Sequence, residues 1–174
     1  MYYCLPKSQL NRLQHIQNAL ARAVVAAPRS SNPDHILRSL HWLKVHERIE
    51  FKVISTTYKV LQSSSPRYLR DLIKLQPFRS TRSSTLVTLL QPSVHSSLKI
   101  TNRSFRHAAP HLWNNLPPTL RAPSHSSSSP SSSSFSSSLP SSSPSSVSDP
   151  VLGISNGAFH SHLKTFLFSK SFPP

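Results

Sequence analysis

The sequence has little of several features on which many active sites depend. Cys4 is the only cysteine, which excludes an internal disulfide, a multi-cysteine zinc site and an iron–sulfur cluster within one chain. With two glycines in 174 residues, there is no phosphate-binding glycine loop and no G-x-S-x-G nucleophile motif. No apolar run approaches the roughly 20 residues that a membrane-spanning helix needs. We therefore expect no cofactor and no membrane span, and the single cysteine fits an intracellular protein.

Acidic residues are also scarce. The chain has 5 of them against 20 lysines and arginines, and its formal net charge is +15. Metal-dependent phosphoryl transfer needs several carboxylates around one site, but no two aspartates are adjacent here. We therefore expect no enzyme activity and no metal site. An unneutralised basic surface favours polyanions, because phosphate contacts release condensed counterions. The charge balance predicts non-specific binding to RNA or DNA, or else a fragment whose acidic partner surface is missing.

The candidate phosphate-binding residues lie in a window without acids, between Leu72 and Ser148. We predict that five cations of this window contact nucleic acid: Arg79, Arg82, Lys99, Arg103 and Arg106. Aromatic residues interleave with cations along the chain, as in surfaces that bind single strands. However, Trp42, Tyr58 and Trp113 fall on apolar helical stripes, so we predict that they pack in the core.

Ten histidines invite a metal hypothesis, but their spacing does not support one. His107 and His111 are four residues apart, and His160 and His162 are two apart. Neither pair belongs to a two-plus-two zinc pattern, and neither has a carboxylate nearby in the sequence. Surface or packing roles are therefore the better prediction.

Hydrophobic periodicity predicts a helical region over residues 1–75. A first helix, from Ser8 to about Ala27, has apolar residues three and four positions apart on one face: Leu10, Leu13, Ile16, Leu20, Val24 and Ala27. Asn32-Pro33-Asp34 predicts the start of a short second helix. Two apolar stripes between Val45 and Gln62 predict a central helix that packs on two faces. A fourth helix is predicted from Pro66 to about Leu75.

The remaining chain falls into three parts. Residues 76–123 are basic and partly irregular, with two segments that could pair as a hairpin (85–90 and 97–101) and a helix from Phe105 to Leu116. Residues 124–150 are rich in Ser and Pro, which predicts a disordered linker. Residues 151–174 contain a predicted C-terminal helix, from Phe159 to Lys170. The predicted fold class is mainly α, a small helical bundle with a loosely structured basic C-terminal half and a disordered Ser/Pro insert.

Several short motifs occur in an order typical of one family. They are Leu40-His41-Trp42-Leu43, Arg48-Ile49, Phe51-Lys52-Val53, Tyr58-Lys59, Pro66-Arg67-Tyr68-Leu69, Ala109-Pro110-His111-Leu112-Trp113-Asn114 and the closing Phe159 to Phe168. In this order they resemble the segment that follows the polymerase core in reverse transcriptases of non-LTR (LINE-type) retrotransposons. The chain departs from the family at Lys44, where the family has proline, and in the Ser/Pro insert.

The resemblance implies an accessory region that helps to hold template RNA or target DNA, without the catalytic palm. The expectation is a non-catalytic remnant of such an enzyme. Two alternatives stay open. The chain could be a protein-interaction module that uses exposed helix faces, or a translated relic without a selected function. It could instead be a mitochondrially targeted basic protein, because its first 33 residues contain no acid and form an amphipathic helix. We expect an intracellular location, nuclear or cytoplasmic, with the mitochondrial alternative left open.

Overall fold

The computed structural model describes residues 3–63, 65–77, 86–93, 103–123 and 152–173. Within this part, the chain forms six α-helices and one short 3-10 helix, and its β pairings are isolated bridges. The prediction of a mainly helical fold is therefore confirmed. The Ser/Pro-rich residues 124–150 lie outside the described part. Among the described helices, none combines the length and apolar character needed to cross a membrane.

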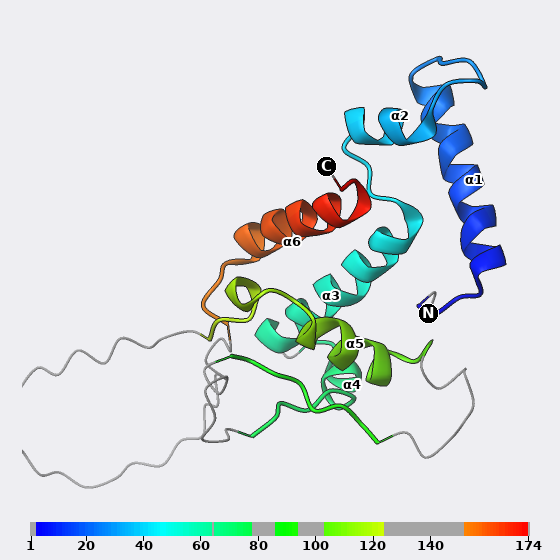
Figure 1. Cartoon of the computed structure of the whole chain (residues 1–174). Coiled ribbons are helices and arrows are strands. Elements are labelled where there is room, and N and C mark those ends of the chain that lie inside the picture. Colours follow the sequence, from blue (N-terminus) through cyan, green and yellow to red (C-terminus); the bar gives the residue numbers. More distant parts are fainter. Residues whose placement is uncertain (1–2, 64, 78–85, 94–102, 124–151, 174) are drawn as a thin grey trace, which may run out of the picture.

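The central element is α3 (Val45–Ser63), as the two apolar stripes predict. It packs against both α5 (Phe105–Asn114) and α6 (Asn156–Ser171), as Figure 1 shows. Val53 and Val60 are buried on one stripe, and Ile54, Tyr58 and Leu61 on the other. A helix in the middle of the chain therefore joins segments that are far apart in the sequence.

Three aromatic rings form the middle of this core. The rings of Tyr58 and Phe159 stack with centroids 3.9 Å apart, and the Phe159 and Trp113 centroids are 6.0 Å apart. Tyr58 donates its hydroxyl hydrogen to the Ile154 carbonyl at 2.7 Å. The predicted core positions of Tyr58 and Trp113 are confirmed, whereas Trp42 is half-buried against a second, smaller cluster.

An ion pair fastens the far end of α6 to the start of α3. Glu50 is buried, and its two carboxylate oxygens accept hydrogen bonds from Lys170 Nζ at 2.8 and 2.7 Å. His46 Nε2 lies 3.2 Å from the same carboxylate. Because a buried carboxylate needs compensating partners, this contact orients α6 along α3.

Two helix starts agree with their local signals. The Asn32 side chain accepts a hydrogen bond from the Asp34 amide at 2.9 Å, which caps α2 (Pro33–Ser39) as predicted. Ser155 caps α6 by accepting a hydrogen bond from the Ala158 amide at 3.4 Å. The C-terminal helix therefore begins three residues before the predicted start.

The fourth helix is much shorter than predicted. α4 (Arg67–Arg70) ends well before Leu75, because the following backbone is engaged elsewhere. Leu75 forms an antiparallel bridge with Leu89, in which the Gln76 amide donates to the Thr88 carbonyl at 2.9 Å. A long-range backbone pairing at residues 74–76 therefore takes the place of the end of the predicted helix.

The first segment of the predicted hairpin, residues 85–90, pairs with other parts of the chain, so the hairpin prediction is wrong for this segment. Its predicted partner, residues 97–101, lies outside the described part. Both backbone edges of 86–90 have other partners. One edge pairs with residues 74–76, where the Leu90 amide donates to the Lys74 carbonyl at 2.8 Å. On the other edge, the Asn114 side chain accepts from the Leu89 amide at 3.0 Å and donates to the Leu89 carbonyl at 2.8 Å. The Asn114 amide thus takes the place of a neighbouring strand.

The largest departure from sequence reasoning concerns α1 (Lys7–Val24). Its buried residues are Gln17 and Ala21, while Ile16 and Leu20 are 58% and 57% exposed. The cause is a set of amide hydrogen bonds. Gln17 Nε2 donates to the Leu43 carbonyl at 2.7 Å. Gln14 Oε1 accepts from the Val45 amide at 3.0 Å, which satisfies an unpaired donor at the start of α3. Leu13, Ile16, Leu20 and Val24 therefore remain exposed, whereas Ala27 at the end of the same face packs against the smaller cluster.

Candidate nucleic-acid interface

The described structure places two of the five predicted phosphate-binding residues. Arg79, Arg82 and Lys99 lie outside it. Arg106 is exposed in the first turn of α5, and Arg103, just before that helix, is half-buried. The Arg103 Nε atom is buried and has no hydrogen-bond partner among the described residues. We call Arg79, Arg82, Arg103 and Arg106 the arginine patch. It stays a prediction, and Arg103 and Arg106 are its described members.

A second basic surface runs along α3. Arg48, Lys52 and Lys59 are all exposed. At about 100° per residue, their spacings of four and seven place them within about 40° of each other around the helix axis. The ridge from Arg48 to Lys59 is about 16 Å long at about 1.5 Å per residue. We call these three residues the α3 basic ridge.

Two adjoining hollows border this ridge and share Lys59. The larger, of about 600 Å³, is bounded by the end of α3 and the start of α6. Its lining residues are Tyr58, Lys59, Gln62, Ser63, Leu152, Gly153, Ile154, Ser155 and Asn156. The smaller, of about 270 Å³, is lined by Phe51, Lys52, Ser55, Thr56, Lys59, Val60, Ser65, Pro66 and His160. Together they form what we call the α3 groove, which holds two lysines and many hydroxyl and amide groups.

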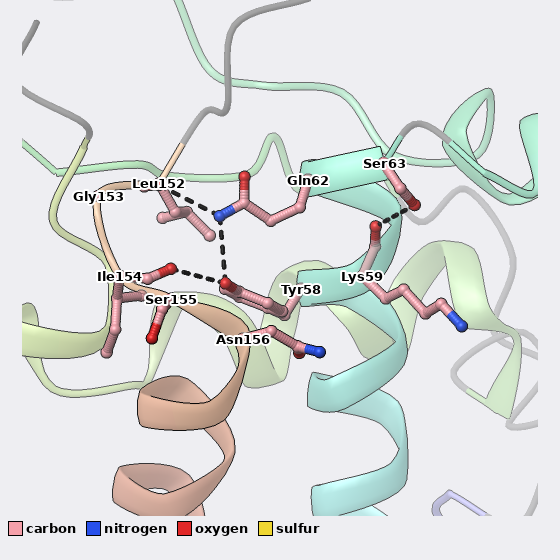
Figure 2. Close-up of a pocket in the computed structure, with 9 residues that line it drawn as sticks. All are labelled: Tyr58, Lys59, Gln62, Ser63, Leu152, Gly153, Ile154, Ser155 and Asn156. Carbon is pink, nitrogen blue, oxygen red and sulfur yellow. Dashed lines mark hydrogen bonds between the residues drawn. The ribbon is translucent and has the colours of Figure 1, made fainter.

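Figure 2 shows how the larger hollow is built. Gln62 Nε2 donates to the Leu152 carbonyl and to the Tyr58 hydroxyl, both at 3.2 Å. These bonds hold the chain before α6 against the end of α3. The Lys59 side chain extends away from Gln62 and from residues 152–155. The walls are therefore held by hydrogen bonds in which the Lys59 amine takes no part.

The charge of the groove is one-sided. Among the described residues, no acid lines either hollow. The ion pairs of the described residues involve Asp34 and Glu50, and none of them includes a cation of the α3 basic ridge. The N-terminus of α6 adds the partial positive charge of its unpaired amides to the same side. The groove is therefore suited to anionic oxygens.

Other perturbed groups lie away from the groove. Partial burial, together with the neighbouring Cys4 and Glu50, raises the pKa of Tyr3 to about 12, and its hydroxyl lies 3.1 Å from His111 Nδ1. Burial lowers the pKa of Arg121, whose Nε donates to the Leu116 carbonyl at 3.0 Å. Within the described ranges, no three His, Cys, Asp or Glu residues gather as metal ligands would. His160 is half-buried; its Nδ1 donates to the Asn156 carbonyl at 2.7 Å, and its ring centroid lies 5.7 Å from that of Phe159.

Lys52 and Lys59 were not among the five predicted phosphate-binding residues, although both belong to the family motifs. The local signal was present, because their helical spacing puts them opposite the buried stripes of α3. The other wall of the groove carried no such signal. Ser155 and Asn156 are more than ninety residues from Lys59, and only the docking of α6 brings them beside it.

No protein-family model, curated protein or solved structure matches this chain. The likeness to non-LTR reverse transcriptases therefore rests on the order of the motifs alone.

Proposed function

We propose that this chain binds RNA or DNA through phosphate groups, with little sequence preference and without catalysing a reaction. The observation that carries the proposal is the α3 groove, in which Lys52 and Lys59 line two adjoining hollows whose described lining residues include no acid. Lysines beside serine, threonine and amide groups supply the donors that phosphate oxygens accept from. The formal net charge of +15 would draw any polyanion toward this surface.

The order of the family motifs supports the same proposal from another direction. We propose that the chain is a non-catalytic remnant of a non-LTR reverse transcriptase, in which an accessory segment has kept an affinity for nucleic acid. Two of the motifs, Phe51-Lys52-Val53 and Tyr58-Lys59, contain the lysines of the groove. Purified chain is expected to show no primer extension with magnesium or manganese, since it has 5 acids in all. Nucleotide incorporation above background would contradict the non-catalytic part.

The test is the salt dependence of binding to a duplex DNA and to a single-stranded RNA of mixed sequence. Each neutralised duplex phosphate contributes about −0.9 to the slope of log affinity against log salt. Replacing the α3 basic ridge, as Arg48→Ala, Lys52→Ala and Lys59→Ala together, should flatten the duplex slope by roughly 2–3 units. The fold should persist, because exposed substitutions usually change stability by about 0.5 kcal/mol or less.

A matched control separates the groove from the overall charge. Lys7, Arg12 and Arg29 are also exposed cations, and they lie outside the groove. Changing all three to alanine removes the same charge, and it should flatten the slope by less than about one unit. A third variant, with alanine at Arg79, Arg82, Arg103 and Arg106, tests the arginine patch. Equal slopes for the groove variant and the unchanged protein would remove the groove from the proposal.

A further inference from the structure

Tyr68, in α4, is an aromatic residue on the surface of the molecule. Its side chain is 69% exposed, whereas the other described Phe, Tyr and Trp residues are buried or half-buried. Within the described ranges, no hydrogen bond or ring contact holds the Tyr68 side chain. One exposed apolar side chain is common on a protein surface, so its surroundings decide whether it has a role.

Tyr68 lies beside the smaller hollow of the α3 groove. Ser65 and Pro66 line that hollow together with Lys52 and Lys59. Tyr68 follows Pro66 by two residues, so their Cα atoms are at most about 7 Å apart. The packing of α4 against α3 holds this segment next to the groove. The exposed ring therefore adjoins the surface for which we proposed phosphate binding.

Cations surround the ring. Arg67 precedes it in α4 and is exposed, as is Lys59 in the groove, and no described ion pair includes either of them. Arg70 and Lys74 lie in the same segment, where Asp71 is the single acid. Positive charge therefore prevails around an aromatic surface, which is the combination that proteins use to bind single strands.

The neighbouring apolar residues favour a strand over a membrane surface. Interfacial binding needs several apolar side chains on one face of a helix, but α4 is 4 residues long. Leu69 packs against the core and Ile73 is buried, which leaves Leu72, exposed by 40%, as the nearest apolar neighbour of the ring. A nucleotide uses both parts of the site, because its base can stack on the ring while its phosphate pairs with a cation.

We propose that Tyr68 stacks on an unpaired base of a single strand whose phosphates contact Lys52 and Lys59. This inference rests on the proposed function and adds a preference for single strands. In a duplex, neighbouring bases cover both faces of each base, so the ring has no free face to contact unless the base leaves the stack. Stacking is also tolerant of sequence, because every base has a π face.

The test compares binding of a single-stranded oligonucleotide of about 12 nucleotides with that of a duplex of the same sequence, by fluorescence anisotropy with the full chain. Tyr68→Ala should weaken binding of the single strand at least about fivefold. Binding of the duplex should change by less than about twofold, since phosphate contacts dominate there. Tyr68→Phe keeps the ring and should bind both like the wild type. Equal binding of the single strand by Tyr68→Ala and the wild type would overturn the inference.

Two controls show whether the effect belongs to the ring and to a base. Ile16→Ala also removes an exposed apolar side chain, 58% exposed and outside the groove, and should leave binding unchanged. An abasic strand of equal length keeps the phosphates and lacks the bases. Tyr68→Ala should bind this strand as the wild type does. If the variant weakened abasic and ordinary strands equally, Tyr68 would not be stacking on a base.

The variant of the α3 basic ridge separates this inference from the function on which it rests. A flattened salt slope in the ridge variant, with unchanged single-strand binding by Tyr68→Ala, would contradict stacking alone. No binding of either nucleic acid by the wild type would contradict both. Vesicles of phosphatidylcholine with about one third phosphatidylserine should bind the wild type and Tyr68→Ala equally, through charge. Weaker vesicle binding by Tyr68→Ala, with unchanged strand binding, would assign the ring to a membrane instead.

Discussion

Truncation of Phe159 gives the sharpest test of the way α6 docks on α3. Phe159 is fully buried, with its ring between those of Tyr58, at 3.9 Å, and Trp113, at 6.0 Å. Replacing a buried phenylalanine by alanine costs about 3–5 kcal/mol, because apolar contact is lost and a cavity remains. Phe159→Leu keeps most of the apolar contact but loses the stacked rings, so we expect a cost of about 1–2 kcal/mol.

The assay is urea unfolding followed by circular dichroism, with the free energy extrapolated to water. Lys164→Ala is the control on the same helix, because Lys164 is exposed, and it should change stability by about 0.5 kcal/mol or less. We expect the free energy of unfolding to be much lower for Phe159→Ala than for Phe159→Leu, and equal to the wild-type value for Lys164→Ala. If Phe159→Ala cost about 1 kcal/mol or less, the docking of α6 and the groove beside its N-terminus would both be wrong.

Two other predictions concern the Ser/Pro tract and Tyr3. The residues on either side of 124–151 are joined by a backbone bridge between Pro123 and Leu152, and the composition of the tract predicts a flexible loop. Replacing 124–151 by a Gly/Ser loop of about a quarter of its length should therefore reduce the entropic cost of closing the loop by about 1.2 kcal/mol, which favours the folded state. The thermal midpoint should not fall, and a drop of several degrees would contradict a passive linker. Because the folded pKa of Tyr3, about 12, lies above the ordinary value of 10.0, its contribution to stability is present below about pH 10 and is lost as the pH rises toward about 12. Urea midpoints of wild type and Tyr3→Phe should approach each other over this range, and a constant difference would refute the shift.

Much of the helical structure follows from local signals in the sequence. The Asn32 cap and the proline that follows it specify the start of α2, because both act within one turn. The two stripes of α3 identify a helix buried on two faces, and α3 ends within one residue of its predicted end. The basic ridge is local as well, since Arg48, Lys52 and Lys59 follow the helical repeat.

Tertiary structure decided which side of each element became the inside. Hydrophobicity alone selects the face of α1 that contains Ile16 and Leu20, yet the adjoining face with Gln17 and Ala21 is buried, because Gln17 binds the carbonyl of Leu43. The end of α4 likewise depends on Leu89, which lies far along the chain. The second wall of the groove comes from α6. Hydrogen bonds and apolar contacts between segments far apart in the chain leave no periodic pattern in the sequence. For this reason they can be identified only from the tertiary structure.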